Sequence, residues 1–287
     1  MTCSRERATL PACRSIHRLK ARSYNSAPSC RDTQSEFGQL GIEALGARVT
    51  PLLVPGLAGV TNLALGGFHS CALLDDGGVR CWGSGQDGQM GNGRLLPSRR
   101  PIPVPLDLAA TDIACGRAHC CVILVDKTMR CWGDNRLGQL GAPGLELGIV
   151  PRAVRPGGGA SGMALANVRA MALGSATTIA IRAESLDEPG RLFGWGANDG
   201  DQLDPGLGNI IDVPVEIFTG FAVDQIVLGS GHLCARLSSG AVRCAGANEA
   251  GQLGTGVAGE RVPFPAGEVA DVHGAVEITA GAIPVRS

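Results

Sequence analysis

The stretch HSCALLDDGGVRCWG, residues 69–83, decides the fold because it lies inside a longer segment that the chain repeats. Residues 63–91 read LALGGFHSCALLDDGGVRCWGSGQDGQMG, and residues 113–141 read IACGRAHCCVILVDKTMRCWGDNRLGQLG. The pattern returns at 226–254 and, in a longer and altered form, at 171–203. The first glycines of the units are 50, 58 and 55 residues apart: Gly66, Gly116, Gly174 and Gly229. Such a period is typical of a domain built from one repeated structural unit.

Each unit has the composition of a small antiparallel β-sheet. Short apolar segments end at glycine or turn residues, a polar loop leads to Gly-Gln-Leu-Gly or a variant of it, and a connector follows. No segment sustains the periodicity of an amphipathic helix. Four strands per period of this length match one blade of a β-propeller. We therefore predict an all-β propeller of four-stranded blades, with about four complete blades and a partial fifth from residues 36–60 and 275–287.

The recurring Gly-x-x-His, Trp-Gly and Gly-Gln-Leu-Gly elements resemble the repeats of the regulator of chromosome condensation family over about residues 37–287. The resemblance implies a β-propeller, usually of seven blades, so four complete units are fewer than in the family's ring. If the ends meet as in the family, FGQLG (37–41) and EITAGAIPVRS (277–287) form one incomplete blade.

A rigid propeller of this repeat type, with a mildly acidic body and no recognisable catalytic groups, is expected to act as a non-enzymatic scaffold for protein–protein interaction. Two alternatives remain open. One is guanine-nucleotide exchange on a small GTPase, the activity of the family's founding member. The other is extracellular inhibition of an enzyme, as in some similar propellers.

Three hairpins have cysteines at matching positions. Cys71 and Cys81 are centred on Asp76, and the other pairs are centred in the same way on their own turns. Such residues face each other across antiparallel strands at a Cα separation of about 4.5–5.5 Å, within disulfide reach. In the third unit both are missing together, since Ile179 and Gly194 stand there. We predict three structural disulfides, each worth up to roughly 3 kcal/mol: Cys71–Cys81, Cys121–Cys131 and Cys234–Cys244.

Zinc is the alternative use of these cysteines. His69, His119 and His232 each lie two residues before a cysteine, on the same strand face. One histidine and two cysteines per blade are one ligand short of a closed structural zinc site. The resemblance implies a structural, hydrogen-bonded histidine, so we expect no metal and no cofactor. Cys115 and Cys120 are expected to be small buried thiols without a catalytic role.

Charge and motif content argue against several function classes. Residues 1–31 hold seven basic residues and one acidic residue, which leaves 18 basic and 25 acidic residues in the rest. No Lys/Arg cluster follows, so nucleic acid is not a favoured partner. No apolar run approaches the roughly 18 residues of a membrane span. Gly83–Gly88 fits Gly-x-Gly-x-x-Gly without the helix that a dinucleotide needs. No acid pair has a spacing suited to catalysis, and we expect no enzyme.

The repeat is interrupted twice, and both insertions fall at the third unit. A Gly/Pro-rich connector spans residues 142–168, and the hairpin around residues 182–191 is longer than its counterparts. Binding residues concentrate in unique loops on a rigid scaffold. We therefore expect an unidentified protein partner to bind at these loops, through candidate residues Arg152, Arg155, Glu184, Asp187 and Glu188.

Residues 1–35 are expected to form a basic head, disordered or used for targeting, ahead of the propeller at 36–287. The head is rich in Arg and Ser and poor in acids, as organellar transit peptides are. The 11 cysteines and their pairing favour an oxidising or extracellular compartment instead. These two indications point to different compartments.

Overall fold

A computed structural model describes residues 29–30, 36–42, 52–157, 163–185, 188, 190–259, 261–269 and 272–280. These residues form four four-stranded antiparallel sheets and one two-stranded pair. The single helical segment within the described part is the short 3-10 turn η2, Pro205–Leu207. Within those same ranges, no helix has the length and apolar character needed to cross a bilayer.

The strands follow one another in chain order within each sheet, as the repeat predicts. The first sheet holds β3 (Val60–Leu65), β4 (His69–Leu74), β5 (Val79–Gly83) and β6 (Ser98–Pro103). The second holds β7 (Ala110–Cys115), β8 (His119–Leu124), β9 (Met129–Asp134) and β10 (Leu147–Ala153). The third holds β11 (Val168–Leu173), β12 (Thr177–Arg182), β13 (Arg191–Ala197) and β14 (Ile210–Ile217). The fourth holds β15 (Val223–Leu228), β16 (His232–Leu237), β17 (Val242–Gly246) and β18 (Val262–Glu268). The pair consists of β1 (Ser29–Cys30) and β2 (Leu52–Leu53).

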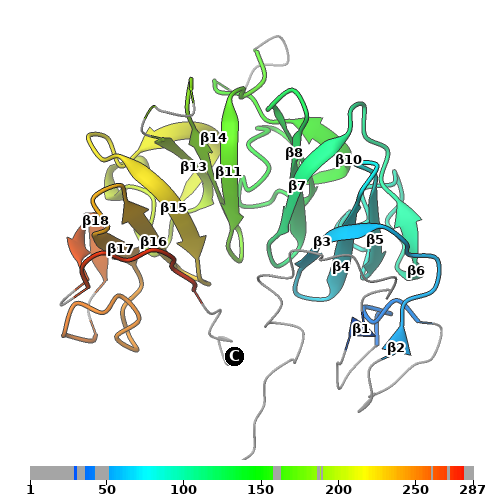
Figure 1. The fold of residues 1–287 in the computed structure, drawn as a ribbon, viewed down its shortest axis with the longest axis horizontal. Helices are drawn as coiled ribbons and strands as arrows, with labels where there is room; N and C mark the ends of the chain where they lie inside the picture. Colours follow the sequence, from blue (N-terminus) through cyan, green and yellow to red (C-terminus); the bar gives the residue numbers. More distant parts are fainter. Residues whose placement is uncertain are drawn as a thin grey trace, which may run out of the picture.

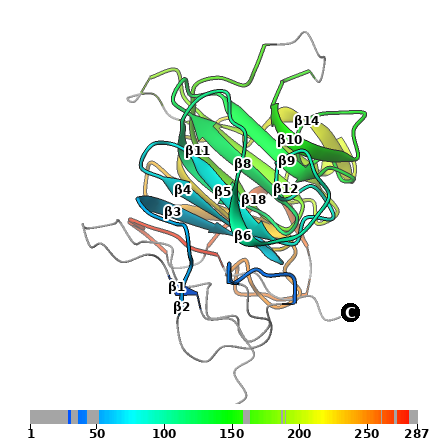
Figure 2. The ribbon, with the colours of Figure 1, turned by 90° about the vertical axis from the view of Figure 1, so that its right-hand side faces the viewer.

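The four sheets stand side by side as propeller blades in an open arc (Figure 1). Consecutive first strands contact each other, β3 against β7, β7 against β11 and β11 against β15. Figure 2 shows the same blades from the side, with strands of neighbouring blades stacked across the molecule. The predicted fold class, an all-β propeller with four complete blades, is confirmed.

The two ends of the propeller segment lie at opposite ends of this arc. Residues 36–42 pack against the first blade, where the Gln39 carbonyl accepts a hydrogen bond from Trp82. Residues 272–280 pack against the fourth blade, where Gln225 and the Ile278 backbone exchange two hydrogen bonds of 3.0 Å. The expected shared blade is therefore not formed by the described parts of FGQLG and EITAGAIPVRS. Each end instead extends the core of a different blade.

One glycine recurs in every blade because no other residue fits its position. Gly83, Gly133, Gly196 and Gly246 have φ of 107°, 108°, 104° and 109°. Such values lie outside the regions open to L side chains. A Cβ on Gly133 would also lie 2.4 Å from the Ala118 carbonyl oxygen. The glycine that follows each tryptophan, or Ala245 in the last unit, thus permits the sharp bend in the third strand.

The second strands of the blades are buried on both faces. All six residues of β8, HCCVIL, are buried, as are the first five of β12. A strand in the middle of a sheet that packs between two neighbouring sheets is buried on both faces, so its sequence is a continuous apolar run. Stacking therefore supplies the core that one blade could not form alone.

Candidate functional site

Each of the first three blades is held to the preceding unit by a buried tryptophan. Trp82, Trp132 and Trp195 are fully buried. Their Nε1 atoms donate to the carbonyls of Gln39, Gln89 and Gln139, each at 2.9 Å. The acceptors belong to the Gly-Gln-Leu-Gly or Gly-Gln-Met-Gly segment of the unit before. This segment is therefore part of the blade interface.

The structure contains the three cross-strand disulfides that join the second and third strands of their blades. In each, the two cysteines are directly opposed register partners, and their Cα atoms are 4.1 Å apart, slightly closer than the predicted separation. The bonds are Cys71–Cys81, Cys121–Cys131 and Cys234–Cys244. The third blade has no such bond, because Ile179 and Gly194 are paired at these positions.

The expectation that Cys115 and Cys120 are separate thiols is wrong. They are register partners at the ends of β7 and β8, and a fourth disulfide joins them. The reason is the tight turn at Gly116–Ala118, which brings the residues on either side of it face to face. The other three pairs are predicted because residues equidistant from a hairpin turn face each other. The same geometry applies to the hairpin formed by β7 and β8.

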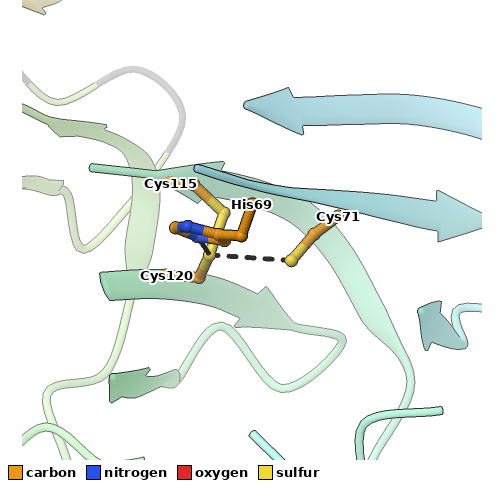
Figure 3. A group of neighbouring side chains, drawn as sticks. All are labelled: His69, Cys71, Cys115 and Cys120. Atoms are coloured by element: carbon orange, nitrogen blue, oxygen red, sulfur yellow. Dashed lines mark hydrogen bonds between the residues drawn. A yellow bond between two sulfur atoms is a disulfide. The ribbon is translucent and has the colours of Figure 1, made fainter. Parts of the chain in front are cut away.

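The Cys115–Cys120 disulfide lies against the first blade. The Cys120 Sγ is 3.7 Å from the Cys71 Sγ and 3.0 Å from Nε2 of His69 (Figure 3). His69, Cys71 and Cys120 are buried, and Cys115 is half-buried. Two disulfides from adjacent blades thus meet beside a buried imidazole.

The equivalent position in the next interface is occupied by a hydroxyl. His119 Nε2 lies 2.9 Å from Thr178 Oγ1, which donates to the Gln139 carbonyl at 2.8 Å. Burial lowers the pKa of His69 to about 4. It also lowers the pKa of His119 to about 3, with a smaller contribution from His69. Both rings are therefore neutral at physiological pH.

The connector expected at 142–168 is not a single loop, because residues 147–153 form strand β10, and only the part that follows this strand leads to the same face of the arc as the hairpin insertion. We define the hairpin face by its turns between second and third strands, residues 75–78, 125–128, 183–190 and 238–241. The backbone at each of the first two turns bonds to the start of the following blade, Ala110 N to Gly77 O at 2.9 Å and Val168 N to Lys127 O at 3.0 Å. The insertion in the third blade occupies the same position, since Gly190 pairs with Val223.

The predicted site residues lie in different places around this face. Glu184 and Glu188 are exposed in the long turn of the third blade, and Asp187 lies outside the described residues. Arg152 is exposed on the outer strand β10 of the second blade, while Arg155 is partly buried in the connector after it. The two arginines and the two glutamates thus belong to different elements. Their shared use in binding stays a prediction.

The sequence prediction did not include a basic region on the first blade. Arg99 and Arg100 are exposed on the outer strand β6. An open depression of about 820 Å³ beside them is also lined by Glu36, Phe37 and Pro97. The dipeptide is visible in the sequence, but its proximity to residues 36–37 depends on how the first segment packs. Nothing in one repeat unit encodes that contact.

Comparison with known repeats identifies the blades. The Regulator of chromosome condensation (RCC1) repeat profile matches residues 60–89, 110–139 and 223–252, and a second profile of this repeat matches residues 76–123. The chain belongs to the regulator of chromosome condensation repeat family. The resemblance inferred from the Trp-Gly and Gly-Gln-Leu-Gly elements is thereby confirmed.

Relatives of known sequence place the chain within this family. The RCC1 domain-containing protein RUG3, mitochondrial, of Arabidopsis thaliana is 30% identical over 247 residues, which cover 83% of this chain and 54% of that protein. The Protein RCC2 homolog of Xenopus laevis is 37% identical over 101 residues, 34% of this chain and 19% of that protein. The chain thus spans about half the length of the Arabidopsis relative.

Solved structures share the fold. Human WBSCR16 superposes with a TM-score of 0.76 at 22% identity, covering 90% of this chain and 66% of that one. Prp20p of Saccharomyces cerevisiae superposes with a TM-score of 0.68 at 22% identity, covering 84% of this chain and 58% of that one. Both agree with a propeller built from these blades.

Proposed function

We propose that this chain is a non-enzymatic scaffold that binds another protein through the hairpin face of its third blade. Family membership supports a binding role, and the unique insertion in the third blade supports the location. The observation that carries the location is that the insertion is tied at its start to Asn167, in the connector before β11, and at its end to Val223 of the fourth blade. Anchoring both ends of a loop lowers the entropic cost of ordering it on binding.

The hydrogen bonds around the insertion describe this anchoring. At its start, Ala183 N donates to Asn167 O at 3.1 Å, and Asn167 Nδ2 donates to Glu184 at 2.5 Å. Arg182 forms an ion pair with the same glutamate. At its end, Gly190 forms a β-bridge with Val223 of the fourth blade. The insertion therefore spans the junction between two blades.

The exposed side chains suggest the chemistry of the partner. Glu184 and Glu188 are exposed acids on the insertion, and Met163, in the connector that precedes β11, is 86% exposed. A partner that offers basic side chains beside an apolar one fits this arrangement. Arg152 and Arg155 on the preceding blade would then lie at the margin of the contact.

A loop exchange tests the proposal. Residues 183–191 are replaced by Val-Asp-Lys-Thr, the turn at 125–128 of the second blade, and proteins that co-purify with each form are quantified after cross-linking. The matched control replaces the turn 75–78 by the same four residues. We expect the first exchange to remove partners whose cross-links map to residues 182–191, and the control to retain them. Partners that survive the first exchange unchanged, or the absence of any such cross-link, would contradict the location.

The alternative of guanine-nucleotide exchange has its own test. Binding to Gsp1p and histones has been described for Prp20p, and it is a property of that protein. Release of labelled GDP from a panel of small GTPases, measured with and without this chain, distinguishes exchange from scaffolding. Acceleration by the chain would replace the scaffold proposal, and no acceleration leaves binding as the role.

For the compartment, we propose that residues 1–35 direct the chain to mitochondria. The basic, Ser-rich composition of this segment and the mitochondrial name of the Arabidopsis relative support this proposal. Residues 1–35 fused to a fluorescent protein should co-localise with a mitochondrial dye. A fusion that stays diffuse, or enters the secretory pathway, would overturn the proposal.

A further inference from the structure

The interface between the first two blades brings one histidine and three cysteines together at a single point. A ring nitrogen of His69 and the Sγ atoms of Cys71, Cys115 and Cys120 all lie within 4.8 Å of one another. His69 and Cys71 come from β4, whereas Cys115 and Cys120 come from β7 and β8 (Figure 3). The first blade thus contributes two ligands to this cluster, and the second blade contributes the other two.

This ligand set is one that structural zinc sites use. Three thiolates and one imidazole form a closed tetrahedral site, with Zn–S distances of about 2.3 Å and Zn–N distances of about 2.0–2.1 Å. Two sulfurs on such a tetrahedron lie about 3.8 Å apart, and the Cys71 and Cys120 sulfurs are already 3.7 Å apart. Cys115 would move away from Cys120 once their bond is broken, and His69 would withdraw slightly from Cys120.

The neighbouring interface shows what is special about this one. There His119 Nε2 has a hydroxyl partner, Thr178 Oγ1, at 2.9 Å. At the first interface Nε2 of His69 has a sulfur within reach, and sulfur is a weak hydrogen-bond partner. Leu173 and Thr178 stand where the second blade has Cys115 and Cys120. Among the described blades, Cys115 and Cys120 therefore have no counterparts in the third blade. They occur at the interface where His69 and Cys71 of the first blade face them.

We propose that His69, Cys71, Cys115 and Cys120 bind one zinc ion when the Cys71–Cys81 and Cys115–Cys120 disulfides are reduced. The protein then has two forms, one with two disulfides at this interface and one with zinc joining the same two blades. In a reducing compartment the zinc form prevails, and in an oxidising compartment the disulfide form does.

The conversion balances with a dithiol as the reductant. Two dithiol molecules give two electrons and two protons each, so both protein disulfides open and each dithiol closes its own disulfide. Zinc then binds the sulfurs of Cys71, Cys115 and Cys120 as their three thiol protons leave to solvent. Neutral His69 binds through the lone pair of Nε2 with its proton on Nδ1, and Cys81 keeps its thiol proton. The half-buried Cys115 gives the reductant its access.

The test measures zinc directly. Purified chain is incubated with zinc with or without a non-thiol phosphine reductant, the folded monodisperse fraction is isolated, and its zinc is counted by elemental mass spectrometry. We expect one zinc per reduced chain and none per oxidised chain. Cobalt(II) in place of zinc should show the visible absorption of a tetrahedral thiolate site. Reduced wild-type chain without zinc would overturn the proposal, and no variant is needed to obtain that result.

Variants drawn from the chain's own repeats locate the ion. Cys115→Leu with Cys120→Thr installs the residues of the third blade and should remove the zinc. Cys234→Ser with Cys244→Ser, in the fourth blade, should leave one zinc per chain. Cys81→Ser should also retain it, whereas Cys71→Ser should not. Zinc retained by the Cys115/Cys120 variant, or lost from the Cys234/Cys244 control, would place the ion elsewhere and refute the site.

Discussion

The tryptophan-to-carbonyl bonds predict that one substitution has different costs in two blades. Trp132 and Trp195 are both fully buried, and each donates at 2.9 Å to the carbonyl of Gln89 or Gln139. Phenylalanine in place of either keeps an aromatic ring but loses the donor. The Gln139 carbonyl would still accept from Thr178 Oγ1 at 2.8 Å. The Gln89 carbonyl would lose the one side-chain donor that it has among the described residues. The second blade has Cys120 at the position of Thr178, so no hydroxyl is there to replace the lost indole.

The difference can be estimated because the packing loss is nearly the same in both variants. Losing a hydrogen bond whose acceptor stays satisfied costs about 0.5–1.5 kcal/mol, whereas leaving a buried acceptor without a partner costs about 1–3 kcal/mol. Trp132→Phe should therefore destabilise the fold by roughly 0.5–1.5 kcal/mol more than Trp195→Phe. For a domain of this size, 1 kcal/mol shifts the melting temperature by roughly 2–4 °C.

Urea unfolding followed by circular dichroism measures both variants without relying on tryptophan fluorescence. A third variant, Trp195→Phe with Thr178→Val, removes the second donor to Gln139 and also the partner of His119 Nε2, so it should cost at least as much as Trp132→Phe. Equal costs for the two single variants, or no added cost from Thr178→Val, would refute the role assigned to these carbonyls.

The remaining predictions concern disulfides, a glycine and a histidine. Peptide mapping of the oxidised chain should recover Cys115 linked to Cys120 together with the three cross-strand pairs, and a mixed Cys71–Cys120 peptide would contradict this connectivity. Gly91→Ala should cost clearly more than Gly144→Ala in thermal unfolding. Both glycines have positive φ, but a Cβ on Gly91 would lie 2.8 Å from the Trp132 ring while Gly144 has open space. Similar costs would show that the ring is not a constraint. Burial lowers the pKa of His232, so the unfolded state takes up its proton first as the pH falls below about 6.5. Stability should therefore fall on acidification from that pH, and it should fall less steeply in His232→Gln. Identical slopes would contradict this.

Much of the fold follows from the sequence because it depends on repetition. The Trp-Gly element marks a bend that requires positive φ, and the apolar runs such as HCCVIL mark strands buried on both faces. Cys71 and Cys81 are opposed because their hairpin has a short symmetric turn. These features are local to one unit, so reading four units together makes them visible.

Contacts between different blades are harder to predict from the sequence of the repeat. The contact of His69 with Cys120 joins residues in different blades, and its distance depends on the angle at which the blades cross. The separation of the two ends in the arc likewise depends on small rotations that add up from blade to blade. Cys115–Cys120 is different, since its hairpin could have been recognised by the facing rule. The prediction considered only the hairpin between the second and third strands of each unit, and not the one between the first and second strands.

The distribution of cross-links has a mechanical consequence. In the first, second and fourth blades a disulfide joins the second and third strands, and the third blade has no such bond. If the chain is pulled from its ends, the residues enclosed by each disulfide cannot be extended. In these blades only the segments outside the disulfide can lengthen. The third blade can be drawn out along its whole length. Tension on the oxidised chain would therefore open that blade fully, together with its insertion, and a partner bound to the insertion would be released by force.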